Sequence, residues 1–289
     1  MSQTKKRVLF VSSEMTPFLN DSPVATISRF LPQAIQEKDH EIRVLVPRFG
    51  VINERRNRLH EVVRLSGINI SIDDKDNPLM IKVASLPEAR MQVYFLDNED
   101  YFHRKFVFTD DKNKFFDDND ERVIFFCKGV LETVKKLGWA PDIIHCHGWM
   151  TSLIPAYLKT LYKDEPVFKH SKVVYSVFEN EFKESLGKDF ARKATLNEIP
   201  DKQLETFGKG DNKSMHMGGV KHADAVVDCC TSKIDPELAK LFNSFYTEHS
   251  INNAESEEKK QLRIQLAILT AATLSKAMRA LGIDVPEQM

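Results

Sequence analysis

The chain opens with two apolar, strand-length segments joined by one amphipathic helical segment, and this pattern constrains the fold most. The strands are predicted at residues 7–13, RVLFVSS, and at 41–47, EIRVLVP. Between them, residues 22–38 repeat apolar side chains at helical spacing, with Ser22 as cap and Pro23 in the first turn. A strand, a helix and a strand in this order form a parallel pair with a right-handed crossover. The chain is therefore predicted to be an α/β protein.

The rest of the chain repeats this alternation, with one departure. Residues 60–97 contain three strand-like runs separated by the turn-like sequences DDKDNP and PEAR, which predicts an antiparallel insertion. Other predicted elements are helices at 118–138, 149–162 and 236–246, and strands at 141–149, 172–180 and 223–230. Residues 183–221 are polar and less periodic, so we expect loops there. The predicted fold class is an open, mostly parallel Rossmann-like sheet with helices on both faces.

Residues 253–282 predict one long amphipathic helix. Its apolar stripe consists of Leu262, Leu266, Leu269, Thr273, Leu274, Met278 and Leu281. We interpret the chain as a Rossmann-type domain over residues 1–247, followed by this helical segment over 248–289. The stripe either packs on its own domain or pairs with a second copy or a partner chain.

Charge and composition exclude several classes of partner. The 289 residues carry a formal net charge of -1, so no overall field draws the chain to nucleic acid or to an anionic membrane. The sequence has no run of about 20 apolar residues to span a membrane, and its first residues lack the apolar core of a signal peptide. The four cysteines form no CxxC pairs and two are adjacent, which favours reduced thiols and a cytoplasmic protein.

Ligands of such sheets bind outside the carboxyl ends of the parallel strands. These ends are predicted at residues 12–18, 47–49, 145–149 and 178–180. His145 and His147 share a face of one strand, but no third ligand is evident nearby, so we expect no metal site. No GxGxxG sequence is present to indicate a dinucleotide, and no cofactor is expected.

Several of these segments, taken in order, resemble a known enzyme family. They are SSEMTPF, VYFLDNEDYFHRKFVFTD, DNDERVIFFCKGVLETVKKLGWAPDIIHCHGW and LIPAYLK. From about Arg7 to about Glu237 the chain resembles the N-terminal catalytic domain of bacterial glycogen synthases and plant starch synthases. The resemblance implies a retaining glucosyltransferase of GT-B fold, with two Rossmann-like domains facing a cleft. It also implies transfer of glucose from ADP-glucose or UDP-glucose to the end of an α-1,4-glucan.

The first loop departs from the family pattern. After SSEMTPF the family carries Lys-x-Gly-Gly-Leu, whose lysine and glycines approach the donor phosphates. Here Asn20 stands at the lysine, Ser22 and Pro23 stand at the glycines, and Asp21 adds a negative charge. Proline has no N–H to donate. The loop is therefore expected to lack the family's phosphate contacts.

Three further departures concern the sugar pocket and the second domain. Gly148 stands where the family usually has aspartate, and Phe178 and Glu179 stand where its strand ends in Val-His-Asn. The second Rossmann domain needs roughly 200 further residues. Residues 238–289 are too few for it, so we expect this domain to be absent from the sequence.

The strand ends and the resemblance together give a set of candidate residues, with the catalytic residues left unassigned. Candidate substrate-binding residues are Thr16, Pro17, Asn20, His145, His147, Trp149 and Glu179. Trp149 either packs on the sheet or stacks on a sugar. Arg48, Arg55 and Arg56 belong either to a solvated loop or to a rim that contacts an anion or a glucan. The acidic residues 117–121 are interpreted as helix-capping groups and not as a cation site.

Two functions of different class remain open. The first is a short glycogen/starch synthase-like glucosyltransferase whose partner chain, or second copy, completes the site. The second is a non-catalytic glucan-binding or regulatory subunit that keeps the acceptor-side surface over residues 94–149. A phosphosugar-binding protein that uses the arginine loop is a third hypothesis.

Overall fold

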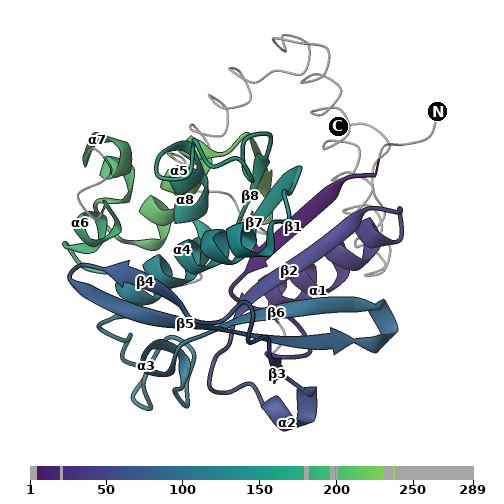
Figure 1. The fold of residues 1–289 in the computed structure, drawn as a ribbon. Coiled ribbons are helices and arrows are strands. Elements are labelled where there is room, and N and C mark those ends of the chain that lie inside the picture. The colour runs from purple at the N-terminus through teal and green to yellow at the C-terminus, as the bar shows by residue number, and fades with distance from the viewer. Residues whose placement is uncertain are drawn as a thin grey trace. The chain divides into compact units, whose positions relative to one another are not determined.

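The computed structural model describes residues 5–19, 22–178, 182–195, 199, 201–230 and 237 (Figure 1). Its strands are β1 (Arg7–Ser12), β2 (Glu41–Pro47), β3 (His60–Glu61), β4 (Ile68–Ile72), β5 (Lys75–Leu86), β6 (Met91–Asp97), β7 (Ile143–His147), β8 (Lys172–Val177) and β9 (Ala225–Asp228). Its helices are α1 (Pro23–Gln36), α2 (Glu54–Asn57), α3 (Glu99–Phe102), α4 (Asn119–Leu137), α5 (Leu153–Lys159), α6 (Phe190–Thr195), α7 (Asp201–Leu204) and α8 (Asn212–His222). Short 3-10 helices cover Pro87–Ala89, Trp149–Thr151 and Glu205–Phe207.

The strands form one mixed, mostly parallel sheet in the order β3-β5-β6-β2-β1-β7-β8-β9, with β4 paired to β5. β1 is parallel to both β2 and β7, and β8 is parallel to β7 and β9. The central strands are apolar because helices cover both faces. Two neighbouring residues of β6 point to opposite faces and show this. The Phe95 ring contacts that of Phe18, which lies in the segment before α1, whereas Leu96 lies close to Gly129 of α4. The predicted Rossmann-like α/β fold is confirmed.

The antiparallel insertion is confirmed, but its turn differs from the prediction. β5 runs antiparallel to β4 and to β6, and β6 itself joins the parallel sheet beside β2. The predicted turn DDKDNP narrows to Asp73 and Asp74, because Ile72 pairs with Lys75 and β5 resumes at once. Asp73 adopts the left-handed region with φ 49°, which aspartate tolerates better than most residues. The residues added to the start of β5, 75–78, therefore pair with β4.

Two helix boundaries follow the predicted local signals. The Ser22 hydroxyl accepts a hydrogen bond from the Ala25 N–H at 3.0 Å, and Pro23 occupies the first turn of α1. α4 ends at Gly138, which adopts φ 62° and donates its N–H to Lys135 O. Both boundaries fall within two residues of the prediction.

Residues 183–221 contain helices where loops were predicted. α8 begins at Asp211, whose carboxylate accepts the Ser214 N–H at 2.7 Å. Its Gly218 and Gly219 lower the helix signal in the sequence. A Cβ at either glycine would collide with the ring of Phe207 or of Tyr175, so close packing requires glycine there. Tertiary packing therefore outweighs propensity in this segment.

The predicted helices at 236–246 and 253–282, and the boundary at 247/248, lie outside the described residues. Within the described residues, no helix is both long and apolar enough to cross a membrane.

Candidate functional site

The carboxyl ends of the parallel strands lie along one edge of the sheet, which we call the carboxyl edge. β1, β2, β6, β7 and β8 end there at Ser12, Pro47, Asp97, His147 and Val177. Hydrogen bonds tie the loops that leave this edge, since the Arg48 N–H donates to Leu96 O at 2.8 Å and the Gly148 N–H donates to Ser176 O at 3.1 Å. Open α/β sheets bind ligands at this edge.

The loop between β1 and α1 brings Thr16 and Pro17 to the carboxyl edge, as predicted. Thr16 is half-buried and Pro17 is exposed, and a cis peptide bond joins them. The Thr16 N–H donates to Ala25 O at 3.3 Å, which fixes the loop against the start of α1. Asn20, predicted in the same loop, lies outside the described residues.

The N-terminus of α1 already faces a carboxylate of this chain. The Ser22 hydroxyl donates a hydrogen bond to the Glu14 carboxylate and accepts one from the Ala25 N–H. Pro23 has no N–H to offer a ligand. A helix N-terminus favours negative charge, so Glu14 is well placed there and would repel a second anion. The described part of this loop therefore does not provide the phosphate contacts of the family pattern.

His145 and His147 stack on each other inside the sheet. Their ring centroids are 4.1 Å apart, and the Phe10 ring lies 6.1 Å from His147. His145 Nε2 contacts the Ser176 hydroxyl at 2.8 Å, whereas both ring nitrogens of the fully buried His147 have no hydrogen-bond partner in the described structure. Burial lowers the pKa of His145 to about 3, and burial with the neighbouring His145 lowers that of His147 well below its usual value. Both rings are therefore neutral at physiological pH.

Trp149 is buried, with 1% of its surface exposed. Its ring lies 4.5 Å from the Phe182 ring and 5.1 Å from the Phe108 ring, and Phe115 lies 6.3 Å away. Packing of Trp149 therefore joins the end of β7 to the loop that carries Phe108 and Phe115 and to the loop that carries Phe182. A sugar could stack on this indole only if one of the phenylalanines moved.

Gly148 occupies a backbone position that suits glycine. Its φ is 76°, in the left-handed region, and its carbonyl accepts hydrogen bonds from the Thr151 and Tyr175 hydroxyls. Phe178, at the end of β8, is buried with its ring centroid 6.3 Å from that of His147. Glu179 lies outside the described residues.

The arginine loop splits into two environments. Arg48 is 9% exposed and forms an ion pair with Glu54. Arg55 and Arg56, on α2, are exposed. Arg48 is therefore not the free rim cation of the sequence interpretation, because Glu54 already neutralises it.

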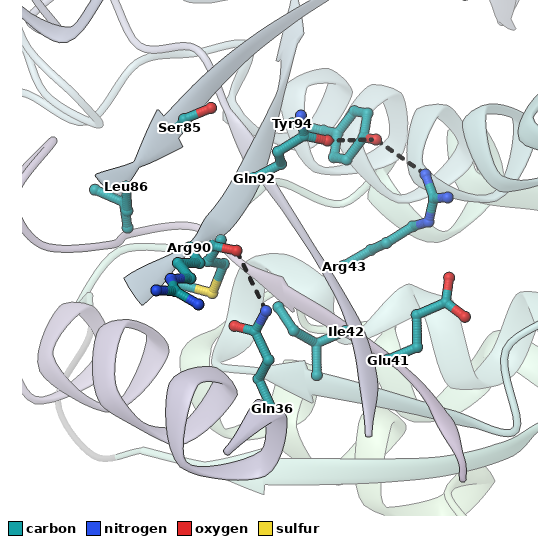
Figure 2. Close-up of a pocket in the computed structure, with 10 residues that line it drawn as sticks. Gln36, Glu41, Ile42, Arg43, Ser85, Leu86, Arg90, Gln92 and Tyr94 are labelled. Carbon is teal, nitrogen blue, oxygen red and sulfur yellow. Dashed lines mark hydrogen bonds between the residues drawn. The ribbon is translucent and has the colours of Figure 1, made fainter. Parts of the chain in front are cut away.

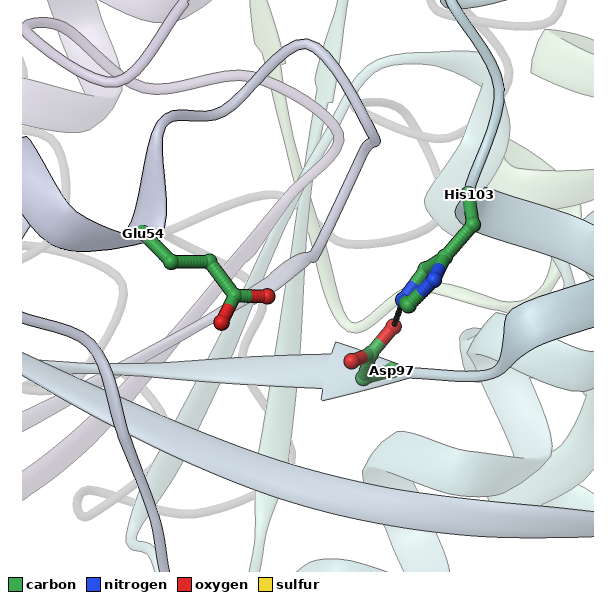
Figure 3. Close-up of side chains that lie close together, drawn as sticks. All are labelled: Glu54, Asp97 and His103. Atoms are coloured by element: carbon green, nitrogen blue, oxygen red, sulfur yellow. Dashed lines mark hydrogen bonds and ion pairs between the residues drawn. The ribbon is translucent and has the colours of Figure 1, made fainter.

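Sequence reasoning missed a chain of alternating charges that runs from Arg48 through Glu54 and Lys82 to Asp97 and ends at the imidazole of His103. Lys82 Nζ lies 2.6 Å from Glu54 Oε1 and 2.9 Å from Asp97 Oδ2. His103 Nε2 lies 2.9 Å from Asp97 Oδ1, and Figure 3 shows these two side chains with Glu54. Residues from a loop, from α2, from two strands and from the end of α3 meet here. Arg48 and Glu54 are six positions apart in the sequence, as are Asp97 and His103, but Lys82, which links the two pairs, is far from both.

Glu54, Asp97 and His103 are close enough together to resemble a metal-binding group. The Lys82 ammonium, however, contacts both carboxylates and supplies the positive charge between them. A divalent cation would have to displace this ammonium and overcome its repulsion. The residues fit an internal lysine better than a metal ion.

A second missed group is Arg122, which is fully buried in α4. Its guanidinium donates to Tyr101 O at 2.8 Å and hydrogen-bonds the Asn119 side chain. The rings of Phe49, Phe102, Phe108 and Phe116 surround it at 5.4 to 5.8 Å. Burial, with the neighbouring Arg104, lowers the pKa of Arg122 to about 9. Arg122 thereby anchors the segment after β6 to α4.

A depression of about 470 Å³ lies at the opposite, amino-terminal ends of β2 and β6 (Figure 2). Its Arg43 donates to the Tyr94 hydroxyl at 2.9 Å and lies over the Trp139 ring, while Glu41 accepts from the Trp139 indole at 2.7 Å. Gln36 likewise donates to Arg90 O at 3.2 Å. These polar groups are engaged with one another, so the depression gives no clear catalytic site.

Comparison with known proteins identifies the larger part of the chain. Residues 7–235 match the model of the starch synthase catalytic domain family. The glycogen synthase of Pelodictyon phaeoclathratiforme is 40% identical over 239 residues, which cover 82% of this chain and 48% of that protein. The glycogen synthase of Chlorobium limicola is 41% identical over 225 residues, which cover 78% of this chain and 45% of that protein. The chain thus spans about half the length of these relatives.

A solved structure shares the fold. The catalytic domain of starch synthase IV from Arabidopsis thaliana, bound to ADP and acarbose, superposes with a TM-score of 0.67 at 19% identity. The superposition covers 86% of this chain and 50% of that one.

The end of the chain gives a separate match. Residues 235–289 match the model of the DALR anticodon binding domain. Periodicity predicts only helices there, at residues 236–246 and 253–282.

Proposed function

The chain belongs to the starch synthase catalytic domain family, and from this premise we propose that it supplies the glucan-facing half of an α-1,4-glucan glucosyltransferase. In this proposal the enzyme transfers glucose from ADP-glucose or UDP-glucose to the end of the glucan. The observation that carries it is the 40% identity to a glycogen synthase over 239 residues, a span that takes in most of the described sheet. The relatives' remaining half, which this chain does not match, would supply most of the nucleotide contacts.

The local geometry at α1 supports the assignment of most nucleotide contacts to the other half of the enzyme. Glu14 and Ser22 occupy the helix N-terminus, and Pro23 removes one N–H. The charge of a donor diphosphate would therefore be stabilised mainly by groups outside the described part of this loop. Such electrostatic stabilisation of the leaving group is often the largest contribution to catalysis.

The buried histidines and Trp149 have a supporting role in the proposal. His147 and Trp149 lie beneath the carboxyl edge and hold the β7 loop, whereas Thr16 and Pro17 reach its surface. The chain is placed in the cytoplasm as part of the same proposal, since Cys127 and Cys146 are buried free thiols.

The test is incorporation of labelled glucose into glycogen by the purified chain, alone and mixed with the unmatched half of a glycogen synthase relative, with ADP-glucose and UDP-glucose in separate reactions. Transfer by the mixture above a heat-inactivated control supports the proposal, whereas transfer by the chain alone shows that the other half is not needed for the donor contacts. Retention on glycogen without transfer by either sample indicates the glucan-binding or regulatory alternative. The absence of both transfer and retention contradicts both functions. A variant with Asn20→Lys, Ser22→Gly and Pro23→Gly restores the family loop and is expected to bind ADP about tenfold more tightly.

A second candidate function concerns residues 235–289, which match an anticodon binding domain. We propose on this basis that the segment contacts transfer RNA. It carries six lysines and arginines against eight aspartates and glutamates, a net of 6 − 8 = −2, so phosphate contacts alone would bind weakly. Gel retardation of transfer RNA by the full chain, and by a chain ending at residue 234, tests this. No retardation at about 10 µM protein in low salt rejects it.

A further inference from the structure

Strands β2 and β6 separate at their amino-terminal ends. From its first residue each of these strands pairs with its other neighbour, β1 for β2 and β5 for β6. With each other they pair only from Val44 and Val93 onward. Residues 42–43 of β2 and 91–92 of β6 are therefore not paired across this part of the sheet. We call the opening between these residues the notch.

The depression at this end of the sheet lies in the notch. Its volume of about 470 Å³ is lined by residues 42–43 and 91–92, and small-molecule sites have roughly 300–1,000 Å³. The Glu41 N–H donates to Lys6 O on the β1 side at 2.9 Å, so the N–H and C=O of the next residue, Ile42, point toward β6. Because the ladder between β2 and β6 omits Ile42, a ligand in the notch can bind these backbone groups.

The notch brings side chains from both faces of the sheet to one ligand position. Arg43 lies over the ring of Trp139, which follows α4, at 4.9 Å, whereas Gln36 belongs to α1. Helices α1 and α4 cover opposite faces, so an intact sheet would separate these two side chains. Both line the depression, as Figure 2 shows, because the strands are not paired there.

Arg43 and Gln36 each keep one buried polar atom available to a ligand. The Arg43 Nη1–H group donates to the Tyr94 hydroxyl at 2.9 Å, and the Gln36 Nε2–H group donates to Arg90 O at 3.2 Å (Figure 2). Arg43 Nε and Gln36 Oε1 are buried and have no hydrogen-bond partner among the described residues. Most buried polar atoms in proteins are hydrogen-bonded, so a donor and an acceptor without partners in one depression indicate a ligand.

The lining of the depression carries an excess of positive charge. Arg90 is exposed and forms no ion pair within the described residues. Its φ is 49°, in the left-handed region that costs a non-glycine residue energy, and such residues are often kept at functional sites. The Glu41 carboxylate is already engaged, since it accepts from the Trp139 indole at 2.7 Å and lies 3.6 Å from the Arg7 guanidinium. Two arginines against one engaged carboxylate favour an anionic ligand.

We propose that the notch binds a small oxyanion that carries a hydroxyl group. The Arg90 and Arg43 guanidinium groups contact the oxyanion, and Gln36 Oε1 accepts a hydrogen bond from the hydroxyl. A phosphate ester and a carboxylate present the same oxygen chemistry to arginine, so the test includes both. The site lies at the end of the sheet opposite to the carboxyl edge, so the inference goes beyond the proposed function and does not depend on it.

The experiment is calorimetric titration of the full chain, at constant ionic strength, with glycerol 3-phosphate, with glycerate and with glycerol. At least one of the two anions should bind with a dissociation constant on the order of 1 mM, whereas neutral glycerol should not bind. Arg90→Gly should weaken anion binding about tenfold, because it removes a charge-assisted contact, and glycine suits the positive φ at this position. Arg58→Gly is the matched control: Arg58 is exposed with φ 53° and does not line the depression, so its replacement should leave the affinity unchanged.

Two further measurements test whether the anion lies in the notch. Arg43→Lys keeps the positive charge but removes the Nε–H donor, so it should weaken binding several-fold. Hydrogen exchange at residues 42–43 and 91–92 should become slower when the anion is bound. Far-ultraviolet circular dichroism confirms that each variant is folded.

Three results of the titration overturn the inference: neither anion binds at about 20 mM, glycerol binds as tightly as the anions, or Arg90→Gly and Arg58→Gly bind the anion equally well. Slower exchange confined to residues 48–54, at the carboxyl edge, would place the anion elsewhere and also overturn it. Glucose transfer to glycogen is measured separately, so failure of the proposed transferase leaves these results unaffected.

Discussion

Replacement of His147 by leucine should change how the stability of the protein depends on pH. His147 is fully buried, stacks on His145, and has no hydrogen-bond partner at either ring nitrogen in the described structure. Leucine has a similar volume and no polar atoms. At about pH 7.5 the variant should be as stable as the native chain or more stable, because a buried polar group without a partner costs about 1–3 kcal/mol.

The effect should grow as the pH falls. The pKa of His147 is well below its usual value of 6.5 in the folded chain, so between these values the unfolded chain binds more protons. Stability therefore falls with decreasing pH, by at most about 1.4 kcal/mol per pH unit for one histidine. From about pH 7.5 to about pH 4.5 the loss due to His147 sums to at most about 2.7 kcal/mol, which is reached if the folded chain keeps this ring unprotonated throughout.

Urea unfolding of both proteins at several pH values measures this effect. The difference between native chain and variant should widen by about 2–3 kcal/mol over that range. His60→Leu is the control, because His60 is exposed on β3 and its replacement should not widen the difference. Parallel stability curves for the native chain and His147→Leu would refute the assignment of a buried, neutral His147.

Three further substitutions test the packing of the site. Trp149→Ala should lower the free energy of unfolding by about 3–5 kcal/mol, measured by urea denaturation, because the indole is buried among rings; a loss below about 1 kcal/mol would contradict this. Gly50→Ala should cost about 1–3 kcal/mol, because its Cβ would overlap the Arg104 backbone; unchanged stability would show that Gly50 and Arg104 are not in close contact. Lys82→Met should cost about 3–5 kcal/mol by leaving the buried Asp97 carboxylate without its ammonium partner, and adding Asp97→Asn should recover part of the loss in a double-mutant cycle; additive losses would speak against the pair.

Local signals made much of the fold predictable. Ser22 and Pro23 mark the start of α1, and Gly138 marks the end of α4, because caps act within one turn. The parallel sheet followed from the alternation of strands and helices. α8 was missed because Gly218 and Gly219 weaken the helix signal, and only the tertiary contact with Phe207 and Tyr175 shows why they are there.

The candidate site was less predictable because distant segments build it. Sequence position suggested Arg48 as a free cation, but its partner Glu54 also binds Lys82, which the register of β5 on β6 brings beside Asp97. No local sequence pattern indicates the register of β5 on β6. The sequence left open whether Trp149 packs on the sheet or stacks on a sugar. Only the structure shows its packing, because the rings that cover it come from loops distant in the sequence.

We propose the carboxyl edge, and not the depression at the other end of β2 and β6, as the functional face of the proposed transferase. Hydrogen exchange of the full chain with and without maltoheptaose tests it most directly. We predict slower exchange at residues 48–54 and 98–108, with no change at residues 85–92 around Arg90. Protection confined to residues 85–92, with none at residues 48–54 and 98–108, would contradict this assignment.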